Sequence, residues 1–181
     1  MKRACVLLAE GFEEIEALTP VDYLRRAGAE VTTIGVSGAR VRGGHGIVVE
    51  TDSGIEAASR DWDCVILPGG GKGADNLAAS PAVVDCVRRH AASGALVAAI
   101  CAAPAVVLHK ACGLLAGRRF TGYPGTEAIV SGAIFSVDRV VVDGNIVTAR
   151  AAGCAGEFAY AIIAALLGEE EADELASKVL L

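Results

Sequence analysis

The chain of 181 residues has few aromatic side chains, no excess of positive charge and no long uninterrupted apolar segment. Aromatic residues make up 4% of it, and the formal net charge is −6. Nucleic-acid surfaces rely on a basic face and stacking aromatics, so we expect no nucleic-acid partner. The longest apolar stretch, Gly94 to Leu108, contains Pro104 and is too short to span a bilayer, so we expect no membrane segment.

Motifs for metals, nucleotides and export are missing as well. The cysteines have no CxxC spacing and no adjacent histidines, which argues against a zinc site. No GxGxxG or Walker loop occurs, and we expect no cofactor. The first residues lack the apolar core and cleavage site of a secretory signal. We therefore expect a cytoplasmic protein with reduced thiols, at Cys5, Cys64, Cys86, Cys101, Cys112 and Cys154.

Segments typical of strands alternate with segments typical of helices. This alternation predicts one domain over residues 1–181, with a mostly parallel sheet covered by helices on both faces. In such folds, ligands bind at the carboxyl ends of the strands. Three predicted loops lie there: 10–12, 68–73 and the turn at Cys101. The predicted strands are 3–8, 30–36, 64–67, 96–100 and a hairpin over 139–149, and the predicted helices are 13–27, 81–93, 102–113, 157–167 and 170–178.

Cys101 stands out among the cysteines because it falls between a predicted strand and a predicted helix. Small residues surround it, with Ala98-Ala99 before it and Ala102-Ala103-Pro104 after it. A nucleophile on a sharp strand-to-helix turn needs such slim neighbours. The amides at the start of the helix favour an anion, so we expect a lowered thiol pKa. The alternative is a buried structural cysteine.

The glycine-rich loop after the strand 64–67 is the second candidate. Glycines let backbone amides approach a ligand closely. The amides of Gly70 and Ala102 could stabilise an oxyanion formed on Cys101. A glycine run is by itself also typical of a simple tight turn.

Acidic residues open the first predicted helix. Carboxylates at a helix start usually face water, and we expect this of Glu13 and Glu14. The helical neighbours of Glu16 are mostly uncharged, and Pro20 should kink the helix beside it. We therefore expect the Glu16 carboxyl to tilt into the cleft.

The three histidines lie apart from one another and from Cys101. His90 and His109 follow or precede basic residues late in helices, so we expect both at the surface. His45 lies between two glycines, and of the three it is the one expected to reach the cleft.

These motifs together resemble the DJ-1/ThiJ/PfpI superfamily over nearly the whole chain. The stretch 9–16, Leu67-Pro68-Gly69-Gly70, the segment 98–104 and the stretch 148–159 all match, and in the same order. They are similar to the branch that contains the Parkinsonism-associated protein deglycase and the bacterial ThiJ/YajL proteins. The resemblance implies a flavodoxin-like three-layer sandwich, like that of class I glutamine amidotransferases, and a homodimer.

The resemblance also implies roles for particular residues. Cys101 would be the oxidation-sensitive nucleophile and Glu16 its protonated hydrogen-bond partner. Gly69, Gly70 and Ala102 would line the anion pocket, and Arg26 would lie near the dimer interface. Some positions depart from the family pattern. Tyr123 stands where a cleft histidine is found, His45 where an arginine is found, and Ala151-Ala152-Gly153-Cys154 where Gly-Pro-Gly-Thr is usual.

Two functions share this site. The first is a cofactor-independent glyoxalase III or protein deglycase, which acts on methylglyoxal or its adducts through Cys101 and Glu16. The second is a redox sensor or chaperone in which Cys101 is oxidised to a sulfinic acid. A thiamine-pathway role has less support because no GxGxxG or Walker loop is present, and an amidase role would rest on fold analogy alone. A peptidase role has less support because the protease-like branch has histidine where this chain has Ala102.

Overall fold

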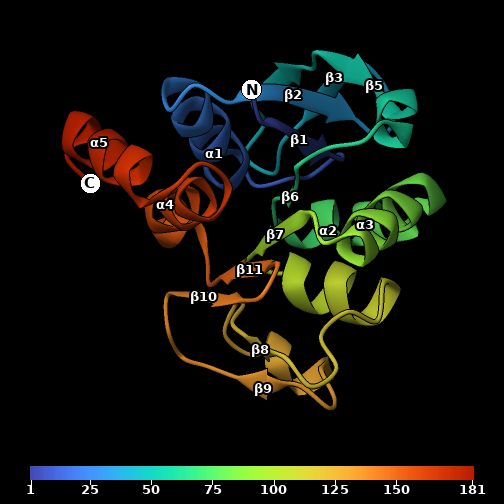
Figure 1. Ribbon diagram of the computed structural model, residues 1–181. Coiled ribbons are helices and arrows are strands. Elements are labelled where there is room, and N and C mark those ends of the chain that lie inside the picture. Colours follow the sequence, from blue (N-terminus) through green and yellow to red (C-terminus); the bar gives the residue numbers. More distant parts are fainter.

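The computed structural model describes all residues from 1 to 181 and is built on one seven-stranded sheet (Figure 1). The strand order is β10-β11-β7-β6-β1-β2-β5, and every neighbouring pair is parallel except β10 and β11. The five central strands follow the order typical of flavodoxin-like folds. The bounds are β1 (Arg3–Leu8), β2 (Glu30–Gly35), β5 (Ser53–Gly54), β6 (Cys64–Leu67), β7 (Leu96–Ile100), β10 (Val140–Asp143) and β11 (Ile146–Ala149).

Helices cover both faces of this sheet, as the sequence predicts. One face carries α1 (Glu14–Arg26) and α4 (Ala155–Leu166), and α5 (Glu169–Val179) packs on the outer side of α4 (Figure 1). The other face carries α2 (Gly71–Ala79), α3 (Pro81–Ser93), the π-helix η2 (Pro104–Ala111) and the 3-10 helix η1 (Ile55–Ser59). None of the helices in the structure combines the length and the apolar character needed to cross a membrane.

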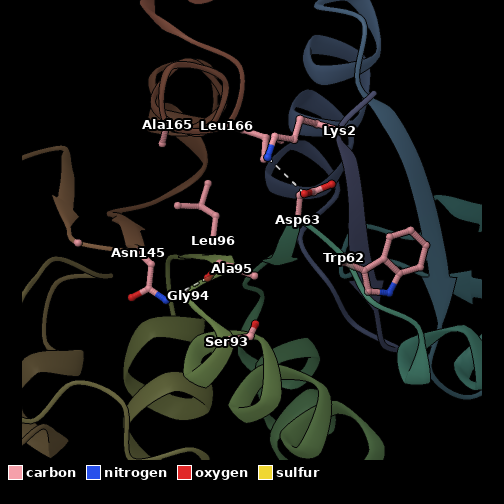
Figure 2. Close-up of a pocket in the computed structure, with 11 residues that line it drawn as sticks. Lys2, Trp62, Asp63, Ser93, Gly94, Ala95, Leu96, Asn145, Ala165 and Leu166 are labelled. Carbon is pink, nitrogen blue, oxygen red and sulfur yellow. Dashed lines mark hydrogen bonds and ion pairs between the residues drawn. The ribbon is translucent and has the colours of Figure 1, made fainter.

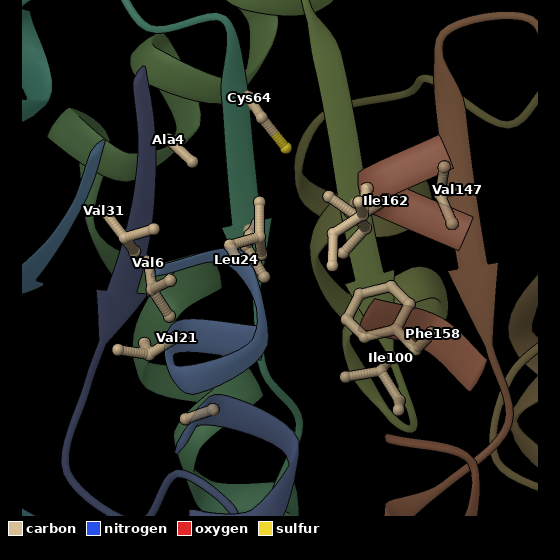
Figure 3. Packing of buried hydrophobic residues seen from close by; sticks show 14 of the residues in the cluster. Ala4, Val6, Val21, Leu24, Val31, Cys64, Ile100, Val147, Phe158 and Ile162 are labelled. Atoms are coloured by element: carbon tan, nitrogen blue, oxygen red, sulfur yellow. The ribbon is translucent and has the colours of Figure 1, made fainter. Parts of the chain in front are cut away.

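The two hydrophobic cores follow from the alternation of side chains along the strands. In β1, Ala4, Val6 and Leu8 face the α1/α4 layer, whereas Cys5 and Leu7 face the layer of α3 and η2. Figure 3 shows the first core, where Val6 lies near Val21 and Leu24 of α1 and where Ile162 and Phe158 of α4 pack over β7 and β11. Because both faces are buried, the central strands read as continuous apolar runs.

Two short sheets lie outside the central one. The hairpin of β3 (Arg40–Arg42) and β4 (Val48–Glu50) is antiparallel, and β8 (Arg119–Phe120) pairs in parallel with β9 (Ile134–Phe135). Two more 3-10 turns, η3 (Thr126–Ile129) and η4 (Ala152–Cys154), complete the chain.

The predicted starts and ends of helices are confirmed where a capping residue marks them. The Ser80 hydroxyl accepts a hydrogen bond from the Val83 amide at 3.4 Å, and Gly94 ends α3 with a φ of +82°. Helix α2 is absent from the sequence prediction, because its first turn contains Gly71 and Gly73, which disfavour helices. The segment after Cys101 is helical as predicted, but it is wound as a π-helix.

Candidate active site

Cys101 follows directly on the carboxyl end of β7 and has a strained backbone. Its φ is +65°, a left-handed value that residues with a side chain rarely adopt. The Cys101 amide donates to the Ala149 carbonyl at 2.9 Å, and the Tyr123 amide donates to the Cys101 carbonyl at 2.8 Å. These two hydrogen bonds hold the strained residue between β11 and the loop at Tyr123.

The loop after β6 brings two glycines against Cys101. A Cβ atom on Gly69 would lie 2.6 Å from the Cys101 Cβ and 2.6 Å from Glu16 Oε2, so any side chain there would collide. Gly70 has a φ of +83°, and its amide faces the Cys101 thiol together with the amide of Ala102. The structure therefore brings together the two amides expected to form an oxyanion site.

Glu16 reaches the same place from the first turn of α1. Its side chain is buried, and the Gly69 amide donates to Glu16 Oε2 at 2.9 Å. Glu13 caps the helix by accepting a hydrogen bond from the Glu16 amide at 2.9 Å, which fixes the start of α1. Glu16 Oε2 and the Cys101 Cβ both lie against Gly69, and each residue shifts the pKa of the other. Glu16 thus points toward Gly69 and Cys101.

The electrostatics of the pair correct one expectation. Burial and the neighbouring Glu16 carboxyl raise the pKa of the Cys101 thiol to about 12, although the Gly70 and Ala102 amides act in the opposite direction. Burial raises the pKa of Glu16 to about 7. The expected lowering of the thiol pKa is therefore wrong, because removal from water outweighs the two amides. The pair holds at most one negative charge near neutral pH.

Glu14 and His45 form a second polar group beside this site. Glu14 is 3% exposed, and its Oε1 accepts from the amides of His45 at 2.8 Å and Ile47 at 3.3 Å. His45 Nδ1 lies 3.0 Å from Glu14 Oε2 and 3.7 Å from Glu13 Oε1. The expectation that Glu13 and Glu14 face water is therefore wrong, since Glu13 caps α1 and Glu14 ties α1 to the β3–β4 hairpin.

A cavity of about 400 Å³ opens next to the Cys101 site. It shares Gly70 and Glu13 with the site, and His45 lies on its wall, but Cys101 itself does not line it. Three basic and two acidic side chains border it, which favours a polar occupant. These basic residues are Arg42, His45 and Lys72, and the other lining residues are Glu10, Gly11, Phe12, Glu13, Gly43, Gly44, Gly70 and Gly71.

Comparison with protein families gives a match to the DJ-1/PfpI family over residues 2–165. The chain belongs to the DJ-1/PfpI family. It is 39% identical to the Parkinson disease protein 7 homolog of Danio rerio over 186 aligned positions, which cover 99% of this chain and 97% of that protein. It is also 32% identical to a deglycase of Pyrococcus abyssi, with 83% of this chain and 91% of that protein covered.

Solved structures of DJ-1 proteins confirm the flavodoxin-like fold. Toxoplasma gondii DJ-1 in an oxidized form matches with a TM-score of 0.96 at 37% identity and covers 99% of this chain and 98% of its own. A cysteine-to-alanine mutant of a DJ-1 superfamily protein from Salmonella typhimurium matches with a TM-score of 0.95 at 39% identity and the same coverage.

Two further residues that the DJ-1/PfpI resemblance points to lie at different distances from the site. Tyr123 is part of it through its backbone, which binds the Cys101 carbonyl, and its side chain is half exposed. Arg26 lies in the last turn of α1 and forms an exposed ion pair with Asp22, with 2.6 Å between Nε and Oδ2. Its role at a dimer interface stays a prediction.

The expectation that His90 lies at the surface is wrong. His90 is 2% exposed and lies on the face of α3 that packs toward the sheet, next to Cys86 of the same helix. Arg88 and Arg89 precede it, but helical periodicity turns His90 toward the sheet while these arginines reach outward. The i to i+4 spacing of Cys86 and His90 is the feature of the sequence that could have indicated this pair. His109 is half-buried, and its Nε2 accepts from the Ser131 amide at 3.3 Å.

A separate cavity of about 470 Å³ lies at the opposite end of the sheet, where the parallel strands begin (Figure 2). Its polar side chains are already engaged with the protein. Lys2 Nζ lies 3.3 Å from Asp63 Oδ1, and the Asn145 amide donates to the carbonyls of Ala91 and Ala95. These contacts join the starts of β1, β6, β7 and β11, so we assign this region to the architecture of the sheet.

Proposed function

We propose that this DJ-1/PfpI protein is a cysteine-dependent enzyme that converts methylglyoxal, or its adducts with amines and thiols, without a cofactor. The observation that carries the proposal is the meeting of three groups at one point. These are the Cys101 thiol on its strained turn, the buried Glu16 carboxyl and the two amides of Gly70 and Ala102. The deglycase relative in Pyrococcus abyssi supports a dicarbonyl or glycated substrate.

The reaction begins with attack of the Cys101 sulfur on the aldehyde carbon. Glu16, with a pKa of about 7, accepts the thiol proton as the carbon–sulfur bond forms, so no preformed thiolate is needed. The aldehyde oxygen gains the negative charge between the amides of Gly70 and Ala102 and then takes the proton from Glu16. The product of this step is a hemithioacetal on Cys101, and Glu16 is a carboxylate again.

A proton then moves between the two substrate carbons. Glu16 removes the proton from the former aldehyde carbon to give an enediolate, and the hydroxyl proton passes from the first oxygen to the second. Glu16 then returns the carbon proton to the adjacent carbon, which leaves a lactoyl thioester on Cys101. Water cleaves this thioester and releases lactate and the free thiol. With a pKa near neutrality, the Glu16 carboxyl can both accept and donate this proton.

Lactate formation from methylglyoxal by purified variants tests the proposal. Cys101→Ala should abolish turnover, because no other group can form the covalent intermediate. Glu16→Gln should lower kcat by roughly 10²–10⁴, the usual contribution of a general acid–base group. Cys112→Ser is the matched control, since Cys112 is a free thiol outside the site and its loss should leave turnover unchanged. Turnover by Cys101→Ala equal to that of the wild type would rule the mechanism out.

A redox-sensor function is the second candidate, and one observation favours it. The Gly70 and Ala102 amides and a protonated Glu16 can all donate hydrogen bonds to a sulfinate on Cys101. Mild peroxide should then add two oxygen atoms to the peptide that contains Cys101. A sensor without enzyme activity would show this oxidation while wild-type protein forms no lactate.

A further inference from the structure

A second group of sulfur and imidazole side chains lies far from Cys101 in the other core. Cys5 is in β1 and Cys86 is in α3, and both point into the layer between the sheet and α3. Both thiols belong to one packed cluster of this core, and each shifts the pKa of the other. His90 completes the group, with 3.5 Å between its Nδ1 and Cys86 Sγ. The mechanism at Cys101 uses none of these residues.

The hydrogen bonds of His90 fix which of its ring nitrogens carries the proton. The Trp62 amide donates to His90 Nε2 at 2.9 Å, so this nitrogen is the acceptor. Nδ1 therefore carries the proton and donates to the Cys86 carbonyl at 2.7 Å, with Cys86 Sγ beside it. A donor held next to sulfur stabilises the thiolate form.

Cys5 and Cys86 differ in their surroundings. The hydrogen bond from the Cys5 thiol lowers the pKa of Cys86, burial opposes this, and His90 and Arg89 lower it further. Burial is the main reason that the pKa of Cys5 is raised well above its usual value. The two thiols thus form an unequal pair, in which Cys86 is the stronger nucleophile and Cys5 stays protonated.

Cys86 also lines a cavity, whereas Cys5 is completely buried. This cavity, of about 700 Å³, lies between η1 and α3 and is bordered by Arg88 and Arg89. Cys86 borders this cavity and Cys5 does not, so a small oxidant in the cavity meets Cys86 first.

We propose that Cys86 and Cys5 form a dithiol that hydrogen peroxide converts into an intramolecular disulfide, independently of Cys101. The Cys86 sulfur attacks one peroxide oxygen, the O–O bond breaks, and a sulfenic acid and water are formed. The Cys5 thiol then attacks the sulfenic sulfur, the S–O bond breaks, and a second water leaves. The two thiols lose two electrons and two protons, and peroxide is reduced to two waters.

Trypsin separates the relevant cysteines, which makes the disulfide directly observable. Cys5 falls in the peptide 4–25, Cys86 in 73–88, Cys64 in 61–72 and Cys101 in 90–110. The Cys101→Ala protein should be treated with peroxide, alkylated and digested without reduction. We expect an intact mass lower by about 2 Da and a linked pair of peptides 4–25 and 73–88, both reversed by a reductant.

Two variants make the result specific. Cys86→Ala, in the Cys101→Ala background, should lose the linked peptides, and Cys64→Ala should keep them, because Cys64 is equally buried but faces the opposite core. In the presence of Cys101, Cys86→Ala should leave methylglyoxal turnover unchanged. The peroxide dose is one that oxidises Cys101 in the wild-type protein. Recovery of both Cys5 and Cys86 as alkylated free thiols after this dose overturns the proposal. A disulfide between Cys86 and a cysteine other than Cys5 overturns it as well.

Discussion

At the scale of single residues, Cys101 and Glu16 act as one titrating unit. Glu16 is 1% exposed, so its carboxylate form loses most of its hydration, and a charge on either partner opposes a charge on the other. The sequence indicated the two residues through small neighbours, the helix start and the family motifs. It could not indicate their pKa values, because these depend on how completely the loop at Gly69 and Gly70 closes over the pair.

The raised pKa of Glu16 predicts a pH dependence of stability. Its ordinary pKa of 4.5 rises to about 7 in the folded protein, so between these values the folded state binds more protons than the unfolded state. The contribution of Glu16 to the free energy of unfolding is therefore greatest below pH 4.5 and is lost as the pH rises through about 7. The full loss is on the order of 3 kcal/mol.

Urea unfolding of wild type and Glu16→Gln at pH 5 to 8 measures this loss. Gln cannot ionise, so the free energy of unfolding of Glu16→Gln, relative to wild type, should rise as the pH is raised. Other groups titrate equally in both proteins and cancel. A difference that stays constant across this range would show that Glu16 has an ordinary pKa.

Gly69 and Gly71 offer a matched pair of substitutions in one loop. Gly69→Ala places a Cβ 2.6 Å from both Cys101 Cβ and Glu16 Oε2, so we expect a loss of about 1–3 kcal/mol in stability and at least about 10²-fold in kcat/KM. Gly71 starts α2 and has no atom within 4 Å of an added Cβ. Gly71→Ala should therefore keep full activity and gain about 0.4–1 kcal/mol. Equal activity of the two variants would contradict the close approach at Gly69.

At the scale of elements, the sequence predicts most of the strands and helices because local signs and burial agree there. Strands β1, β6 and β7 are apolar runs, the first two ending shortly before Gly11 and Gly69 and the third at Cys101, and α3 has both its serine cap and its terminal glycine. Short strands such as β8 and β9 carry no such pattern, since two residues cannot show a period. The role of Glu14 was also hidden, because its partners His45 and Ile47 lie more than 30 positions away in the chain.

Glu14 links two elements, and its removal should loosen the hairpin. The carboxylate accepts from the amides of His45 and Ile47 and binds the His45 ring, so Glu14→Ala leaves several polar groups without partners. We expect a loss of about 2 kcal/mol in the free energy of unfolding and faster amide hydrogen exchange at residues 43–47. Glu50→Ala, an exposed carboxylate in β4 of the same hairpin, is the control and should change stability by less than about 0.5 kcal/mol. Unchanged exchange in Glu14→Ala would show that the hairpin holds its shape alone.

At the scale of the whole molecule, the active site exists because the sheet gathers segments that are distant in sequence. Glu16 follows β1, Gly69 and Gly70 follow β6, and Cys101 follows β7. These three strands are adjacent and parallel, so their carboxyl ends bring the loops to one point. The sequence predicts this meeting through strand order alone, whereas the second thiol pair depends on how α3 packs across the sheet.

The surface beside α1 leads to a prediction about assembly. Ile15 of α1 is 55% exposed, and Ile47 beside β4 is 54% exposed. They line one shallow cavity together with Leu18 and Tyr23 of α1, the helix that also carries Arg26. The DJ-1/PfpI family resemblance implies a homodimer, and this apolar face next to Arg26 is where we expect the second copy to bind.

Ile15→Glu should place a charge in that interface and yield monomers in size-exclusion chromatography with light scattering. Val142→Glu, at a residue 52% exposed on edge strand β10, should leave the dimer intact. If both variants keep the mass of the wild-type dimer, the interface lies elsewhere, and if the wild type is itself a monomer, the dimer is refuted.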